Sequence, residues 1–201
     1  MRFDKITNAA IAIEPESVDI SQFIKFKEKF NKWIHSSTQL VKGLPKSYYI
    51  VSGVTDAFNQ MYGMYNKIGI FEGEYGYHSL VIKNRVTFNL DEADAIVVSH
   101  PFSADGMSSH EKIKIADSYN KPIFVDCAFF GVCHDIDFDF SSYKNIHSVC
   151  FSLSKSFGTG LHRVGLLYTV DRYPVTVYSK WHYPLIACAE HHYTLLDTMS
   201  P

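Results

Sequence analysis

Apolar residues recur every three or four positions in the early part of the chain, between Ser21 and Gly43. The repeating positions are Phe23, Phe26, Phe30, Trp33 and Ile34. Lysines occupy the intervening positions, on the opposite side of a helix with 3.6 residues per turn. The pattern predicts an amphipathic helix, and we assign residues 1–46 to an N-terminal helical segment.

Short apolar runs separated by polar, helix-like stretches follow Pro45. Strands are predicted over 48–51, 68–71, 79–88, 95–98, 122–125, 149–151 and 164–168, and helices over 57–65 and 108–120. Alternating strands and helices favour a three-layer α/β/α fold with a mostly parallel sheet, in which ligands gather at the carboxyl ends of the strands. We expect residues 47–201 to form one compact unit of this kind.

Composition narrows the classes of partner. The formal net charge is −2, from 19 basic and 21 acidic residues without a long run of either sign. The chain thus lacks the excess of basic residues that binding to nucleic acid or to an anionic membrane requires. We therefore expect small molecules or copies of the same chain as partners. The four cysteines form no CxxC pair, and the start of the chain lacks an apolar block. We therefore expect a cytoplasmic protein with no signal peptide, no membrane span and no metal site.

Lys155 is the most informative polar residue of the chain. It stands in the run from Ser152 to Gly158, between two predicted buried strands, and Arg163 follows eight residues later in a second glycine-containing turn. A lysine held there can lose solvent, lower its pKa and form a Schiff base with a carbonyl group. The alternative is an ordinary solvated loop lysine.

Two further features follow predicted strands. Gly53-Val54-Thr55 opens a predicted helix, where backbone N–H groups and a hydroxyl can cradle a phosphate, although Thr is also an ordinary helix cap. Asp126 ends an apolar strand and is expected to have a cationic partner, in a ligand or in a structural ion pair. A Schiff-base lysine, an acid for a ring nitrogen and a phosphate cradle are together the contacts that pyridoxal phosphate requires.

From about Ser47 to Tyr168 the sequence resembles the large domain of the fold-type-I pyridoxal-phosphate enzymes, the aspartate aminotransferase superfamily. Ser152-x-Ser154-Lys155 followed by Arg163-Val164-Gly165 resembles the family's Schiff-base lysine and phosphate-binding arginine. The resemblance implies that Asp126 pairs with the pyridinium nitrogen and that Tyr75 stacks on the cofactor; a packed strand-edge aromatic is the alternative for Tyr75. The cofactor-binding residues that it implies are Ser52, Gly53, Val54, Thr55, Tyr75, Ser103, Asp126, Ala128, Phe129, Ser152, Ser154, Lys155 and Arg163.

The sequence departs from the family at the cofactor's phenolic oxygen. Ser103 stands where the family has an asparagine, Ala104 where it has a proline, and Phe129 where it has a tyrosine. Hydrogen bonds to a charged group are worth about 1.5 to 3 kcal/mol each. Since donors to this oxygen stabilise its anion, their loss predicts a raised pKa for the Schiff base.

The substrate side of the site is less defined by the resemblance. Family members continue into a small C-terminal domain with a carboxylate-binding arginine, whereas this sequence ends at Pro201 and has only Arg2, Arg85 and Arg172 besides Arg163. The aromatic and histidine-rich tail from Lys180 to Tyr193 is expected to line the site's mouth or a dimer contact, and its adjacent His191 and His192 to be a surface pair.

Three functions stay open. The resemblance implies a compact, homodimeric aminotransferase acting on an amino acid or related amine, with Lys155 and Asp126 as its catalytic residues. A second possibility is another pyridoxal-phosphate enzyme, such as a lyase or decarboxylase. The third is a non-catalytic cofactor-binding protein, or a truncated product that retains only the large domain.

Overall fold

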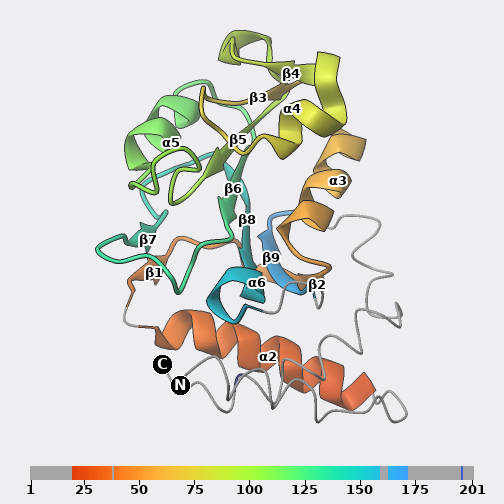
Figure 1. Cartoon of the computed structure of the whole chain (residues 1–201), viewed down its shortest axis with the longest axis vertical. Helices are drawn as coiled ribbons and strands as arrows, with labels where there is room; N and C mark the ends of the chain where they lie inside the picture. The colour runs from red at the N-terminus through yellow and green to blue at the C-terminus, as the bar shows by residue number, and fades with distance from the viewer. Residues whose placement is uncertain (1–19, 38, 159–162, 172–195, 197–201) are drawn as a thin grey trace.

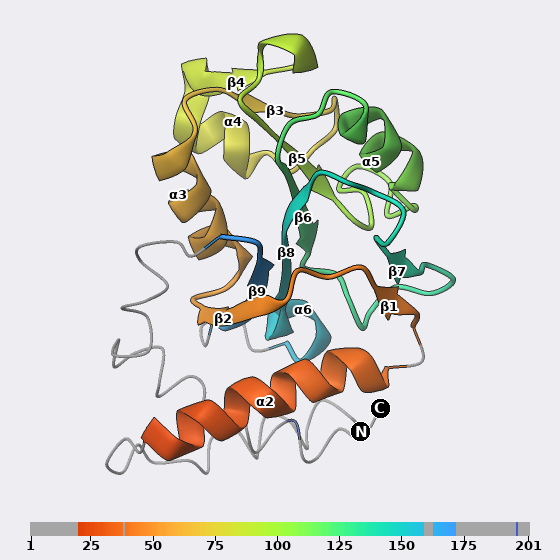
Figure 2. The same cartoon turned by 180° about the vertical axis from the view of Figure 1, so that it is seen from behind.

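The computed structural model describes residues 20–37, 39–158, 163–171 and 196. A central sheet runs through the molecule, and helices α3 and α5 lie on opposite sides of it in both views (Figures 1 and 2). The helices are α2 (Ile20–Ser36), α3 (Val54–Met64), α4 (Tyr77–Ile82), α5 (His110–Asp117) and α6 (Leu153–Ser156), with 3-10 turns η1 (Lys83–Arg85) and η2 (Leu90–Glu92). The three-layer α/β/α prediction is confirmed for these residues.

The main sheet has seven strands in the order β2-β9-β8-β6-β5-β3-β4. They are β2 (Ser47–Val51), β3 (Ile68–Gly69), β4 (Val86–Thr87), β5 (Ala95–Ser99), β6 (Ile123–Cys127), β8 (Ile146–Ser152) and β9 (Gly165–Thr169). Strand β9 pairs antiparallel with both β2 and β8, and the other pairings are parallel. The carboxyl ends of β2, β8, β6 and β5 therefore meet at one edge. A separate pair joins β1 (Val41–Lys42) to β7 (Phe138–Asp139).

The two faces of the sheet bury two different hydrophobic clusters. Alternate side chains of β5 belong to different clusters: Ile96 and Val98 pack with α2 and α5, whereas Ala95 and Val97 pack with α3. Because side chains alternate along a strand, a continuous apolar run such as 95–98 is the pattern expected of a strand covered on both faces. The apolar stripe of α2 lies in the first cluster, as the sequence predicted.

The predicted strand over 79–88 is wrong. Residues 77–82 form α4, residues 83–85 form a 3-10 turn, and only Val86–Thr87 is a strand. His78 and Ile82 are buried whereas Leu80 and Val81 are exposed. This spacing of four residues is that of a helix face, and a short apolar run alone does not distinguish it from a strand.

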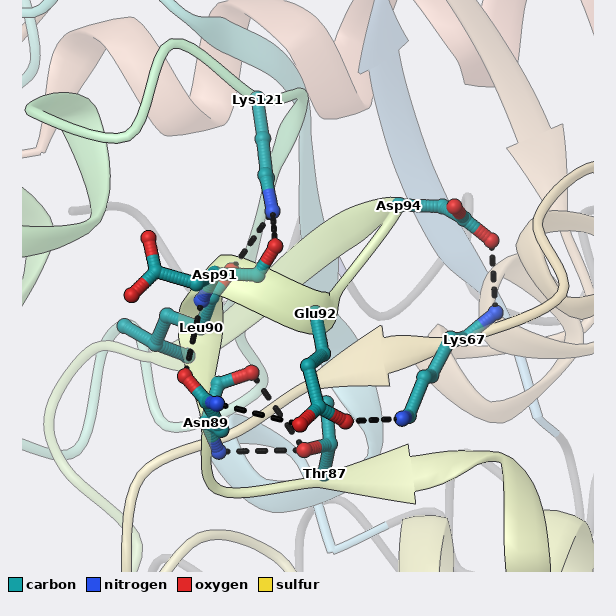
Figure 3. A network of polar contacts seen from close by, with 8 residues as sticks. All are labelled: Lys67, Thr87, Asn89, Leu90, Asp91, Glu92, Asp94 and Lys121. Carbon is teal, nitrogen blue, oxygen red and sulfur yellow. Dashed lines mark hydrogen bonds and ion pairs between the residues drawn. The ribbon is translucent and has the colours of Figure 1, made fainter.

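A polar network fixes the amino end of β5, at the opposite end of that strand from its carboxyl edge (Figure 3). The carboxylate of Asp94 accepts a hydrogen bond from the backbone N–H of Lys67 at 2.8 Å. The ammonium of Lys121 donates to the carbonyls of Leu90 and Asp91 at 2.7 and 2.6 Å. These contacts tie the start of β3 to the start of β5, and η2 to the start of β6, so we interpret the network as structural.

No helix among the described residues is both long and apolar enough to cross a membrane.

Candidate functional site

The carboxyl ends of the parallel strands surround a pocket of about 350 Å³. Its lining residues are Val54, Thr55, Phe58, Tyr75, Ser99, Pro101, Ser103, Asp126, Ala128, Phe129, Ser152, Ser154, Lys155 and Arg163. Eleven of these fourteen are among the thirteen cofactor-binding residues that the sequence resemblance implied. Ser52 and Gly53 do not line the pocket. They form the turn between β2 and α3, where Ser52 N–H donates to the Asp56 carboxylate at 2.9 Å.

One end of the pocket is suited to an anion. The Arg163 guanidinium donates to the Thr55 hydroxyl at 2.5 Å, and Thr55 lies in the first turn of α3. Gly53, the residue before this helix, makes no side-chain cap and has φ 77°, a backbone conformation that favours glycine. A Cβ at Gly53 would lie 3.3 Å from both Nε and Nη2 of Arg163. The first turn of α3, the Thr55 hydroxyl and the Arg163 guanidinium thus converge where a phosphate can bind.

Asp126 provides negative charge elsewhere in the pocket. Its side chain extends from β6, its residue is only 7% exposed, and its Oδ1 accepts a hydrogen bond from Ala128 N–H at 2.8 Å. Burial raises the pKa of Asp126 to about 7, and nearby Glu74 adds to this effect, whereas the Ala128 N–H and the Lys155 ammonium lower it. A buried carboxyl in this state is stabilised by a cation, such as a protonated ring nitrogen.

Lys155 projects from the short helix α6, and its side chain is exposed. The sequence-based expectation of a desolvated lysine is therefore not met in this structure. The ammonium lies 5.4 Å from the centroid of the Phe129 ring, which is itself 48% exposed. The amine is thus accessible to a carbonyl compound that enters the pocket.

The turn that carries Lys155 also presents two serines. The Ser152 hydroxyl caps α6 by accepting from Ser154 N–H at 3.2 Å. The Ser154 hydroxyl is buried in the pocket wall and has no hydrogen-bond partner among the described residues. Since buried hydroxyls are normally paired, this orphaned group is consistent with a polar ligand beside it.

Tyr75 and Ser103 lie at the pocket as implied, but their neighbours differ from the expectation. Tyr75 is 43% exposed and its ring stacks on Tyr77, with centroids 5.9 Å apart. Ser103 is held through its backbone, because its N–H donates to the Ser99 hydroxyl at 2.8 Å. The exposed face of Tyr75 leaves room for a flat ring to stack.

Sequence reasoning missed four residues of the site. Phe58, Ser99 and Pro101 line the pocket, and Glu74 lies behind Tyr75 and Ser99. Ser99 had a usable signal, since it directly follows the apolar run 95–98. The sequence signal for Glu74 was weaker: it is an acidic residue directly before Tyr75, the expected stacking aromatic.

Arg85 is not available to a substrate carboxylate. Its Nε donates to the carbonyl of Asn66 at 2.8 Å, and its Nη2 donates to the carbonyls of Tyr62 and Tyr65 at the end of α3. It caps a helix C-terminus, where a cation is favourable. Arg2, Arg172 and the 180–193 tail lie outside the described residues.

Comparison with known proteins supports the fold. No protein-family model and no curated protein sequence matches the chain. Among solved structures, a histidinol-phosphate aminotransferase from Clostridium acetobutylicum superposes with a TM-score of 0.65 at 16% identity, over 94% of this chain and 63% of its own. A tyrosine aminotransferase from Leishmania infantum superposes with a TM-score of 0.62 at 14% identity, and the match covers 98% of this chain and 68% of that one. A C-S lyase with bound pyridoxal phosphate from Staphylococcus hominis superposes with a TM-score of 0.64 at 12% identity, and the match covers 96% of this chain and 62% of that one.

These similarities confirm the fold expected from the sequence, that of the large domain of fold-type-I pyridoxal-phosphate enzymes. At such identities the likeness concerns the fold alone. The chain spans about 63% of the length of the first solved structures that it matches.

Proposed function

We propose that this protein is a pyridoxal-phosphate-dependent, aminotransferase-like enzyme that acts on an amino acid or a related amine. One observation carries the proposal: a single pocket combines the Arg163–Thr55 pair, the buried Asp126 carboxyl and the accessible Lys155 amine. The three groups match an anion, a ring cation and an aldehyde, which are the three recognisable features of the cofactor.

The binding roles follow from the chemistry of each group. Arg163, Thr55 and the first N–H groups of α3 would hold the phosphate, with the orphaned Ser154 hydroxyl as a further partner. Asp126 would accept a hydrogen bond from the protonated ring nitrogen, and Tyr75 would stack on the ring. Lys155 would form the Schiff base through its Nζ.

When bound, pyridoxal phosphate supplies an electron sink for negative charge on the carbon next to the substrate amine. The protein must then move a proton at that carbon. The Lys155 amine lines the pocket and would take this proton as a general base. The Asp126 carboxylate would favour a protonated ring nitrogen, which is the form that best accepts negative charge.

A visible spectrum of the purified protein with added pyridoxal phosphate tests the cofactor assignment. We expect an absorbance band that borohydride reduces irreversibly and that Lys155→Ala abolishes. Lys144→Ala, at an exposed lysine outside the pocket, is the matched control and should leave the band intact. A band that persists in Lys155→Ala would rule out the Schiff base at this residue.

A lyase is the second candidate, because a C-S lyase is among the proteins with this fold. Assays of keto-acid formation with and without an added amino acceptor separate the two activities, since transamination requires an acceptor whereas a lyase forms its keto acid without one. Cofactor binding without turnover in either assay would favour a non-catalytic protein.

We infer a homodimer in the cytoplasm as the working form. Tyr75 and Phe129 are both substantially exposed at the pocket, which supports a second copy covering this face. Light scattering of the purified protein should give twice the mass of 22.9 kDa, and a monomer would contradict the inference.

A further inference from the structure

Glu74 is a buried acid that no sequence motif predicted. It is 9% exposed and lies in the loop between β3 and α4. One carboxylate oxygen accepts from Tyr75 N–H at 2.8 Å, and the other accepts from Ser99 N–H at 2.8 Å. Both donors belong to residues that line the pocket, so Glu74 fixes the pocket wall from behind.

The position of Ser99 relates Glu74 to Asp126. Ser99 on β5 is the register partner of Asp126 on β6, and both residues line the pocket. Neighbouring strands are separated by about 4.8 Å. The Glu74 carboxyl therefore lies behind the pocket wall formed by Ser99, close enough to Asp126 for its charge to act on that carboxyl.

The two backbone N–H groups donate to different carboxylate oxygens, which an amide with its single acceptor oxygen could not match, so the hydrogen bonds favour an ionised acid here. Burial raises the pKa of Glu74, while its hydrogen bonds from Ser99 and Tyr75 and the Lys112 ammonium on α5 lower it. The charged groups facing the pair are Lys112, beside Glu74, and Lys155, beside Asp126. The Tyr62 phenol interacts electrostatically with Asp126 and with the phenols of Tyr75 and Tyr77. A cation between these elements would relieve the repulsion between the two acids.

We propose that Glu74 is a second acid of the site, a positioning residue whose negative charge behind Asp126 favours a protonated ring nitrogen in the bound cofactor. This inference rests on the proposed function. It adds a role for a residue that does not touch the cofactor: Glu74 holds Tyr75 and Ser99 in place and strengthens the pocket's preference for a cationic heterocycle.

A pair of ligands that differ only at the ring nitrogen tests this charge effect. Pyridoxal phosphate and its 1-deaza analogue, in which carbon replaces that nitrogen, are titrated into the cofactor-free protein and the ratio of their dissociation constants is measured. Glu74→Gln should lower the preference for pyridoxal phosphate about tenfold, which corresponds to one pH unit in proton affinity. Glu72→Gln, at an exposed acid two residues away, should leave the ratio unchanged.

The ratio separates charge from structure. A purely structural Glu74 would weaken both ligands equally in Glu74→Gln, and an unchanged ratio would overturn the inference. If the wild-type protein binds neither ligand and gives no Lys155-dependent absorbance, the proposed function itself fails. If wild type binds through Lys155 and only the ratio is insensitive to Glu74, the further inference alone fails.

If the Glu74→Gln variant does not fold, a measurement on the wild-type protein tests the same inference. Coupling between two sites is reciprocal, so a ring cation favoured by Glu74 must also favour the ionised form of Glu74. In protein with carbon-13-labelled glutamate carboxyls, the titration midpoint of Glu74 should fall when pyridoxal phosphate binds and should fall less with the 1-deaza analogue. Equal midpoints with the two ligands would overturn the inference.

Discussion

Replacing Asp126 with asparagine should stabilise the cofactor-free protein at alkaline pH. The carboxyl is buried, and its pKa is raised from 3.8 to about 7, chiefly by burial. Asparagine has the same shape, cannot ionise, and can still accept the hydrogen bond from Ala128 N–H through its carbonyl oxygen. The substitution therefore removes the unfavourable charge while keeping the local contact.

The sign follows from proton linkage. Because the folded-state pKa of Asp126 lies above its unfolded-state value, the folded protein binds more protons than the unfolded chain between these two values. The free energy of unfolding should fall as pH rises from about 4 to about 7, and the loss is complete at higher pH. A shift of this size corresponds to about 4 kcal/mol, at 1.36 kcal/mol per pH unit.

Urea unfolding of both proteins at several pH values, without cofactor, measures this difference. We expect similar stability near pH 4 and a gain of up to about 4 kcal/mol for Asp126→Asn at pH 8. Comparing the variant with wild type at each pH cancels titrations common to both proteins. The assignment of a buried, destabilising charge would be refuted if the variant were less stable than wild type at pH 8. It would also be refuted if the substitution changed the free energy of unfolding by the same amount at pH 4 and at pH 8.

Three other substitutions probe the pocket and its support. Arg85→Met should lower the free energy of unfolding by about 1.5 to 3 kcal/mol in urea, because it removes a charged cap from the carbonyls at the end of α3; unchanged stability would contradict that capping role. Gly53→Ala should weaken binding of pyridoxal phosphate about tenfold in calorimetric titration, since φ is 77° and the new methyl group would crowd Arg163, and equal affinity would show that the turn tolerates the change. Phe129→Tyr should lower the pH midpoint of the bound cofactor's visible absorbance by about one unit, because a hydroxyl donor is restored near its phenolic oxygen, whereas a higher midpoint would argue against that contact.

The sequence was most informative where an apolar run is continuous. The runs at 48–51, 95–98 and 122–125 are strands β2, β5 and β6 in the structure, each within one or two residues of the predicted limits. Strands β5 and β6 are buried along their whole length, which is where a continuous apolar run is expected, whereas the first residues of β2 are partly exposed. Residues 79–88 lacked this advantage, because burial of only His78 and Ile82 is a tertiary outcome that local pattern does not determine.

The site was predictable to the extent that it lies at strand ends. Asp126 directly follows the apolar run 122–125, Lys155 lies in the turn after the run 149–151, and the parallel sheet brings the two to one edge. Glu74 could not be found this way, since its contact with Ser99 joins residues 25 positions apart through a backbone N–H that carries no sequence signal. The sequence left open whether Lys155 is desolvated or solvated, because its exposure depends on the shape of the pocket around α6.

The distribution of charge in the pocket bears on which ligands can bind. Arg163 and the start of α3 favour an anion at one end, whereas Asp126, with Glu74 behind it, favours a cation elsewhere in the same pocket. A simple anion would satisfy the first group and leave the buried acid pair uncompensated. A neutral apolar ligand would satisfy neither, since buried polar groups without partners are costly. A flat molecule with a phosphate and a basic ring nitrogen meets both demands, and an aldehyde on that ring adds the one reaction for which an accessible Lys155 is suited.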